Sequence, residues 1–168
     1  METIIKIKIT KTELQDIQET MINLINRFPE LPEEVKKEGI QFEQMKPKTI
    51  SMCLSTVSNP YKIRKYIDGS YISRYQFRLL LQTMDVTSEE RIESQAILSK
   101  IGEWLEGRTI LGNNGGSYEM GEYPKLQDKR KIIKIYKNTI PKIMQRLASN
   151  IELTEAKYTV EYYVKNDL

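Results

Sequence analysis

The side chains that most often carry out catalysis are scarce in this sequence. The chain has no histidine and one cysteine, Cys53. Histidine is the commonest general base and a frequent zinc ligand, so Cys53 has no imidazole to activate it as a nucleophile. An unpaired cysteine in an apolar pattern is typical of a core residue, and we interpret Cys53 in that way. A lone cysteine forms no internal disulfide, which favours a reducing cytoplasmic environment.

The remaining polar groups do not assemble into a recognisable reactive site. Glu33-Glu34 and Glu89-Glu90 are sequence neighbours, so their carboxylates splay apart, and the second pair suits the start of a helix. The glycine-rich residues 112–116 lack the lysine and the strand-to-helix context of a phosphate-binding loop. No Cys, Asp or Glu cluster has metal-ligand spacing. We therefore predict no catalytic residue, no cofactor and no metal, and we expect that the protein is not an enzyme.

Length and composition favour one soluble globular domain over residues 1–168. Of the 168 residues, 39% are hydrophobic and 29% are charged, which is an ordinary globular balance. The net charge is only +3, with lysine and arginine interleaved with glutamate, whereas dedicated nucleic-acid binders usually concentrate positive charge on one face. No apolar run reaches the length of a membrane span, and the N-terminus lacks the layout of a signal peptide.

Two segments have the apolar periodicity of helices. The first covers residues 12–28, with Thr12 and Gln15 as a capping pair and Pro29 after its end. The second covers residues 88–106, with Thr87 or Ser88 as its cap and Gly107 in the place of a left-handed C-terminal residue. Before the first helix, the isoleucines of residues 1–11 predict either a short strand or an arm that reaches a neighbouring subunit.

Strands are predicted between and after the helices. Residues 40–45 and 50–54 form short runs, and Asn59-Pro60 marks a break before two extended runs, 61–67 and 70–82. The Asp68-Gly69 pair between these runs predicts a two-residue type I′ hairpin, which would place Tyr66 opposite Tyr71.

The later part of the chain adds two more strands. Residues 133–136 and 156–165 alternate between apolar and polar side chains. Residues 141–150 are interpreted as a linker with some helical character, and residues 112–122 as an exposed flexible loop. Together, these elements predict an α+β fold in which one mainly antiparallel sheet of about five or six strands packs with two helices.

The second arm of the hairpin separates its side chains onto two faces. Tyr71, Tyr75 and the apolar residues that follow share one face, while Arg74 and Arg78 share the other. Neither side of the hairpin is cleanly polar, because Ile63, Ile67 and Ile72 fall on the arginine side. We therefore expect a helix to cover one face and another chain to cover the other.

The same strand also suggests a second hypothesis. Aromatic side chains on a sheet can stack on bases, and arginines such as Arg74 and Arg78 can hold phosphates. A stacking platform needs both residue types on one face, and here they alternate. The arginine face could still line a basic channel or meet acidic residues of a neighbour.

Short motifs in a distinctive order resemble a known family. They are residues 66–70 (Tyr-Ile-Asp-Gly-Ser) and 75–79, a helix-like stretch at 91–106, a Pro-Leu turn with the start of a strand at 123–132, and a closing strand at 158–163. In this order they resemble the phage minor capsid proteins of the tail-terminator type. The resemblance covers about residues 61–164, and the N-terminal helix fits only in position.

The resemblance implies a structural protein of a virion or of a phage-tail-like bacteriocin, assembled in the bacterial host cytoplasm. Such proteins form a ring, usually a hexamer, that caps the tail tube, ends its growth and offers a docking surface for the neck or sheath. The implied partners are further copies of the chain, the tail tube protein, and the sheath protein or head–tail connector. DNA would only pass through the lumen, and no membrane is involved.

In this interpretation, the hairpin residues Tyr66, Tyr71, Arg74, Tyr75 and Arg78 contribute to the subunit interface. Ring closure needs surfaces on both sides of a subunit, and tyrosine is enriched at protein–protein contacts. The alternative within the same class is a head–tail connector or stopper protein. A small nucleic-acid-binding protein is the alternative from another class, and an enzyme would require a carboxylate pocket that the sequence does not indicate.

Overall fold

The computed structural model describes residues 11–47, 49–147 and 150–166, so the predicted N-terminal arm lies almost wholly outside the described residues. The elements in chain order are α1 (Glu13–Asn26), α2 (Glu33–Glu38), β1 (Gln41–Phe42), β2 (Ser51–Lys65), β3 (Tyr71–Met84), α3 (Ser88–Leu105), β4 (Ile110–Leu111), β5 (Ser117–Tyr118), β6 (Arg130–Lys137), β7 (Lys142–Leu147) and β8 (Ile151–Val164).

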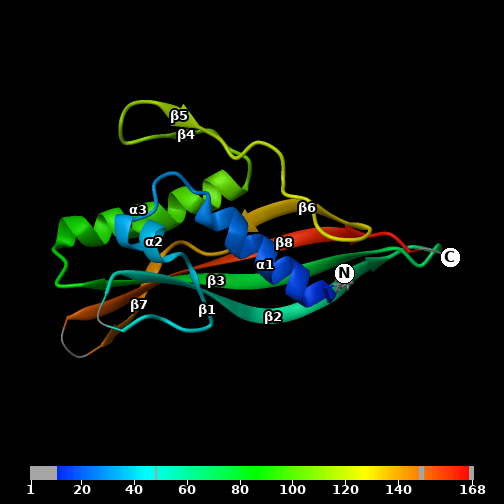
Figure 1. The fold of residues 1–168 in the computed structure, drawn as a ribbon, viewed down its shortest axis with the longest axis horizontal. Helices are drawn as coiled ribbons and strands as arrows, with labels where there is room; N and C mark the ends of the chain where they lie inside the picture. Colours follow the sequence, from blue (N-terminus) through cyan, green and yellow to red (C-terminus); the bar gives the residue numbers. More distant parts are fainter. Residues whose placement is uncertain (1–10, 48, 148–149, 167–168) are drawn as a thin grey trace, which may run out of the picture.

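One six-stranded sheet organises the described residues (Figure 1). Its strand order is β1-β2-β3-β8-β6, and β7 pairs with β8 beside β6. β1 runs parallel to β2, and all other pairs in this sheet are antiparallel. The predicted α+β class with a mainly antiparallel sheet is confirmed. The short helix α2, which begins with Glu33 and Glu34, was not predicted.

The two predicted helices form where their periodicity and caps place them. Thr12 accepts a hydrogen bond from the Gln15 backbone N–H at the start of α1. Thr87 and Glu90 form a complete capping box at the start of α3. After α3, Gly107 has a φ of +85°, the left-handed conformation in which glycine avoids the strain of a Cβ.

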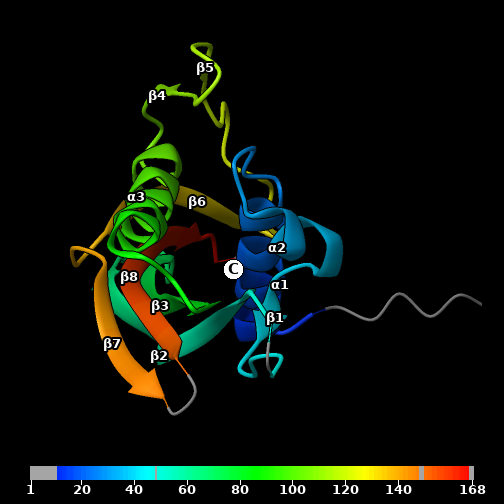
Figure 2. The same ribbon diagram turned by 90° about the vertical axis from the view of Figure 1, so that its left-hand side faces the viewer.

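Both long helices pack on the same face of the sheet, which we call the helix face. Its core is rich in aromatic rings: Tyr75 stacks on Phe77, and Phe77 stacks on Tyr158, with centroid separations of 5.9 and 5.4 Å. The Tyr158 hydroxyl donates to the Leu98 carbonyl of α3 at 2.7 Å. The Tyr162 hydroxyl donates to the Glu13 carboxylate of α1. Figure 2 shows the sheet curving with α1 and α2 beside it and α3 above.

The predicted break at Asn59-Pro60 is wrong, because β2 continues through it. The pairing of β2 with β3 changes register between Ser58 and Tyr61, where extra residues form an irregularity. Proline lacks an N–H and is tolerated at such bulges and at a sheet edge. The sequence therefore contains a bulged strand of 15 residues where two shorter strands were expected.

The hairpin turn is also different from the predicted two-residue type. Gly69 N–H donates to the Tyr66 carbonyl at 3.0 Å, and Tyr66 N–H donates to the Ser70 carbonyl at 2.8 Å, which makes a three-residue loop. Only Gly69 has a positive φ in this loop, at +87°, while an Asp68 oxygen accepts from the Ser70 N–H. A three-residue loop needs one left-handed residue instead of two. The register consequently shifts, and Lys65 rather than Tyr66 lies opposite Tyr71.

Two predictions for the later strands are corrected. Residues 142–147, expected as part of a linker with helical character, form strand β7, because β6 ends at Lys137 and leaves the first residues of β8 open for pairing. In β6, a bulge between Ile132 and Lys134 changes the alternation. As a result Ile132 and Ile135 are buried, while Ile133 is exposed.

The region predicted as a flexible loop, residues 112–122, contains the turn and the second strand of a small hairpin. β4 and β5 pair as a two-stranded sheet, with an Asn- and Gly-rich turn at its tip. The ring of Tyr118 packs edge-on against Phe28, and its hydroxyl donates to Glu30 at 2.6 Å. The loop is therefore anchored to the segment after α1, although it projects from the sheet in Figures 1 and 2.

A buried ion pair ties α1 to the chain that leads into β6. The Asp16 carboxylate accepts hydrogen bonds from the Gln127 N–H at 2.8 Å and from Arg130 at 3.1 Å. The side chains of Asp16 and Arg130 are 4% and 10% exposed. Arg130 also contacts Asp128, which is exposed. Removing one partner of a buried pair leaves the other charge without compensation.

We expect Asp16→Asn to lower the free energy of unfolding by about 2–3 kcal/mol, because the Arg130 guanidinium keeps its burial but loses its counter-ion. Asp128→Asn is the matched control: it removes the exposed partner of the same arginine, keeps a residue type that tolerates a positive φ, and should cost less than about 1 kcal/mol. Urea unfolding measures both. Equal losses for the two variants would contradict the assignment of Asp16 as the structural partner.

Candidate functional site: the open face of the sheet

The five residues predicted for the subunit interface divide between the two faces of the sheet. Tyr71 and Tyr75 lie on the helix face, as the predicted alternation requires. Arg74 and Arg78 lie on the opposite face, which no helix of the described chain covers and which we call the open face. Tyr66 joins them there, with its ring edge-on to Tyr163 at 6.2 Å.

Tyr75 offers no surface with which to contact a second chain. Its exposed fraction is zero, and its hydroxyl is 2.8 Å from the Thr56 hydroxyl. Gln18 of α1 donates to the same Thr56 oxygen at 3.1 Å. Tyr75 is therefore an internal anchor between α1 and β2, because α1 packs directly over its position in the sheet. The assignment of Tyr75 to the interface is corrected accordingly.

Tyr71 lies at the border between the helix and the far part of the hairpin. Its hydroxyl donates to Glu13 at 2.8 Å, and the Lys62 ammonium lies 4.2 Å from its ring centroid. Burial, the hydrogen bond to Glu13 and the charge of Glu13 raise the pKa of Tyr71 to about 12. Tyr71 is therefore neutral at physiological pH and acts as a hydrogen-bond donor.

Arg74 forms the centre of a charge cluster on the open face. Its Nη2 and Nε donate to one oxygen of Glu161 at 2.7 and 3.1 Å. The Tyr136 hydroxyl donates to Glu161 at 3.3 Å, and the Lys134 ammonium lies 3.4 Å from the other carboxylate oxygen. Burial by itself would raise the pKa of Glu161, but the hydrogen bond from Arg74 and the charge of Lys134 outweigh it, so this pKa is lowered.

Arg78 is paired with a carboxylate on β8 in a similar way. The strand register places Arg78 opposite Lys157, and its guanidinium reaches instead to Glu155 at 3.2 Å. Like charges directly opposite one another destabilise a sheet, whereas the diagonal contact with Glu155 is attractive. The side chain of Glu155 is only 5% exposed, so this is a largely desolvated carboxylate.

The pairing changes the interpretation of the arginine face. The sequence suggested that Arg74 and Arg78 line a basic channel or meet acidic residues of a neighbour, but in the structure Glu161 and Glu155 of the same chain neutralise them. Sequence reasoning missed both glutamates. Glu161 is on the polar side of the predicted last strand, residues 156–165, and Glu155 comes just before that strand. Only the register between β3 and β8 shows which arginine each one meets.

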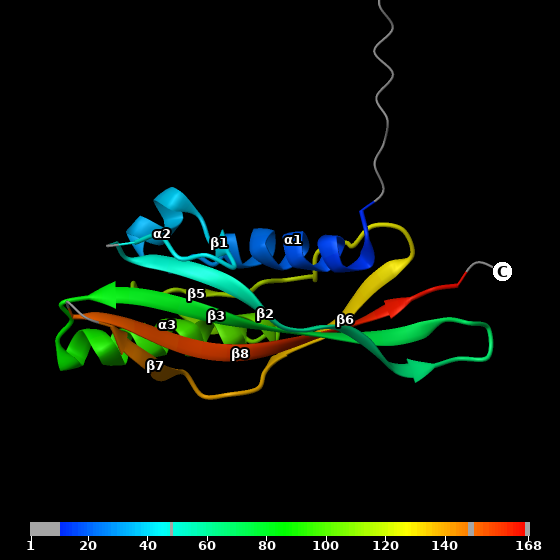
Figure 3. The same ribbon diagram turned by 90° about the horizontal axis from the view of Figure 1, so that it is seen from below.

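The far part of the β2–β3 hairpin carries a group of exposed apolar and aromatic side chains. Figure 3 shows it extending past the helices, at the end of the molecule where the chain terminates. Its exposed large side chains are Tyr61, Ile63, Tyr66 and Ile67. On the outer side of β2, β1 pairs only with Cys53 and Leu54, so residues 57–65 have an edge without a main-chain partner among the described residues.

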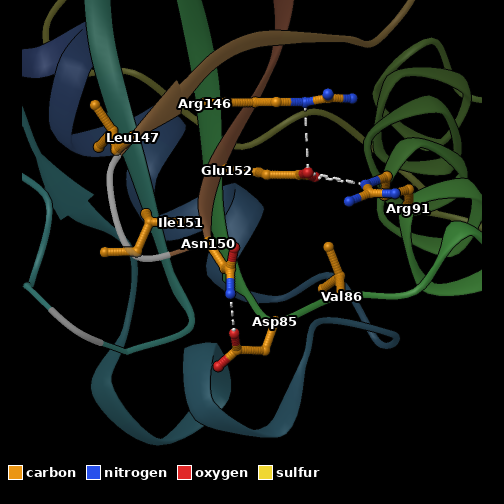
Figure 4. Close-up of a pocket in the computed structure, with 8 residues that line it drawn as sticks. All are labelled: Asp85, Val86, Arg91, Arg146, Leu147, Asn150, Ile151 and Glu152. Atoms are coloured by element: carbon orange, nitrogen blue, oxygen red, sulfur yellow. Dashed lines mark hydrogen bonds and ion pairs between the residues drawn. The ribbon is translucent and has the colours of Figure 1, made fainter.

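A polar cavity of about 560 Å³ lies where β3 leads into α3 and the chain turns from β7 to β8 (Figure 4). Arg91 donates through Nε to both oxygens of Glu152 at 2.9 and 3.0 Å, and Arg146 lies 3.6 Å from the same carboxylate. Asn150 donates to Asp85 at 3.0 Å. These contacts tie the β7–β8 turn to the start of α3, and they account for the charges that line the cavity.

Among the described residues, the thiol and the possible metal ligands are too few at any one place to form a cluster. Cys53 is buried, and burial raises the pKa of its thiol. Among residues 11–47, 49–147 and 150–166, no group of three or more Cys, Asp or Glu side chains could hold a metal ion. The helices in that part of the chain are too short or too polar to cross a membrane.

The sequence matches no protein-family model and no curated protein.

We predict that the Glu161 cluster makes stability depend on acid. Because the pKa of Glu161 in the folded protein lies below its ordinary value of 4.5, its contribution is present above that value and is lost as the pH falls through the folded pKa. Glu161→Gln should cost about 1–2 kcal/mol at neutral pH. It should also flatten the fall in unfolding free energy between about pH 5 and about pH 3.

Chemical denaturation across this pH range measures the effect, and Glu33→Gln, at an exposed carboxylate of α2, is the control. An unchanged pH profile for Glu161→Gln would show that the cluster contributes nothing to acid sensitivity.

Proposed function

We propose that this protein is a structural component of a phage or phage-tail-like particle. In this proposal, copies of the chain form a ring at the head-proximal end of the tail tube, end tube growth and provide the surface on which the neck or sheath docks. The order of motifs between residues 61 and 164 supports the proposal, because it resembles tail terminators. A head–tail connector or stopper protein is the alternative within the same class.

The observation that carries the proposal is the one-sided covering of the sheet. α1 and α3 both pack on the helix face, as the contacts of Tyr158 with Leu98 and of Tyr162 with Glu13 show. The open face and the exposed end of the hairpin are left for other molecules. A subunit of a closed ring needs two different surfaces that fit each other, and the exposed end of the hairpin is suited to be one of them.

The proposed partners follow from this position in a particle. They are further copies of the chain, the tail tube protein, and the sheath protein or a head–tail connector, with DNA passing through the lumen. Direct nucleic-acid binding by Arg74 and Arg78 has little support, because both guanidiniums are already paired with carboxylates. The particle would be assembled in the cytoplasm of a bacterial host.

The proposal predicts self-association and attachment to one end of a tail tube. We expect the purified chain to form a ring of defined mass, alone or after addition of tail tubes, as measured by mass photometry and electron microscopy. A protein that stays monomeric under both conditions and never marks one tube end would overturn the proposal.

A variant at the predicted interface makes the test specific. Tyr66 is exposed, and Tyr163 is its one aromatic ring contact among the described residues, so Tyr66→Ala should leave folding intact and weaken ring formation by about tenfold. Leu111→Ala is the control, because Leu111 is an exposed apolar residue on the separate β4–β5 hairpin. Equal effects of the two substitutions would argue against a contact at Tyr66.

A further inference from the structure

We propose that the end of the β2–β3 hairpin of one copy inserts into a cavity beside α3 of a second copy. This inference rests on the proposed function and deepens it, since it names the two surfaces that meet when subunits associate. The hairpin tip is defined as residues 61–67. The α3 cavity is lined by Glu30, Glu93, Ala96, Ile97, Lys100 and Asn113 and has a volume of about 270 Å³.

The hairpin tip combines exposed isoleucines with neighbouring cations, and the one acidic residue of the turn, Asp68, accepts a hydrogen bond from the Ser70 N–H. Ile67 is fully exposed at the turn, and Ile63 is more than one-third exposed on the strand before it. Arg64 and Lys65 flank them, and the part of the chain that the structure describes gives neither one a carboxylate partner. Exposed apolar side chains of this kind mark interaction surfaces. An isoleucine that stays in water contributes no burial energy to the fold, whereas its burial against a partner favours association.

The tip is built to bind through its side chains and not by adding a strand. The open edge of β2 carries Pro60, which has no N–H to donate, and three register shifts that disturb the regular ladder. Cations at Lys62 and Arg64 also discourage pairing with a second, similar edge. The contact that remains available is the insertion of Ile67 with its flanking charges.

The α3 cavity has the complementary chemistry. Ala96 and Ile97 contribute apolar wall, and Glu93 contributes a carboxylate without an ion-pair partner in the described ranges. Glu30 is already bonded to Tyr118 and Lys100, so it fixes the wall in place and leaves Glu93 free to meet a cation. Ile92, 69% exposed, and Glu89 extend the same apolar and acidic character along the first turns of α3.

The positions of the two surfaces favour contact between copies. The hairpin tip points away from the helices at one end of the molecule, and α3 begins at the opposite end (Figures 1 and 3). The tip therefore does not reach the cavity of its own chain. Two different surfaces on one subunit make a heterologous contact, which repeats from copy to copy and closes into a ring when the rotation allows.

A charge exchange tests this contact on the full chain. Arg64→Glu and Glu93→Arg should each weaken self-association by at least about tenfold, because each one brings like charges together at the interface. The chain that carries both substitutions has opposite charges at that point again, and its association should return to within about threefold of the original. Sedimentation velocity over a concentration series measures all four proteins.

A steric variant and a charge control complete the design. Ala96→Trp should fill the cavity and block Ile67, so it should weaken association even at high salt, where charge effects are screened. Lys125→Glu with Glu119→Lys exchanges two exposed charges outside both surfaces and should leave association unchanged. Circular dichroism and urea unfolding check that each variant remains folded.

The outcomes separate this inference from the proposed function. Rings that form normally in all single variants would overturn the tip-to-cavity contact while leaving the tail-end function standing. Association that follows the charge exchange, in a protein that never attaches to a tail tube, would support the contact and overturn the function. Loss of DNA binding in Arg64→Glu without any change in association would identify the tip as a nucleic-acid surface and overturn the inference.

Discussion

Buried tyrosine hydroxyls determine where the helices sit on the sheet. A tyrosine ring contributes apolar area to the core, but its hydroxyl needs a partner when it leaves water. Tyr158 finds that partner in the backbone of α3, Tyr162 in the first turn of α1, and Tyr75 in the Thr56 hydroxyl that also binds α1 through Gln18. These contacts hold both long helices on the helix face of the sheet. The open face therefore has no helix over it in the described chain.

The open face is held together by charge instead of by a helix. Glu161 and Glu155 on the central strand β8 meet Arg74 and Arg78 on β3, so the pairs cross the strand boundary and support its register. A sheet face of paired charges can stay in water and still accept a partner. The far end of the β2–β3 hairpin extends past the helices in Figure 3, and it carries the fully exposed Ile67.

Elements with strong local signals were predictable, and elements that depend on distant pairing were not. The Thr12 and Thr87 caps locate α1 and α3 because each cap acts over three residues of its own chain. β7 was missed, since residues 142–147 become a strand only through the open edge of β8. The loop after Lys65 was misjudged because Asp-Gly fits both a two-residue and a three-residue turn. Glu161 and Glu155 could not be assigned to their arginines without the register.

Local patterns along the chain were enough to predict the α+β class, the two long helices, the burial of Cys53 and the separation of tyrosine from arginine along β3. These are consequences of periodicity and composition, which act within a few residues. The folded structure was needed to show that Tyr75 is an internal anchor, that Arg74 and Arg78 are neutralised within the chain, and that Ile67 at the hairpin tip is fully exposed. Burial and charge pairing depend on which distant segments become neighbours, and a linear pattern does not contain that information.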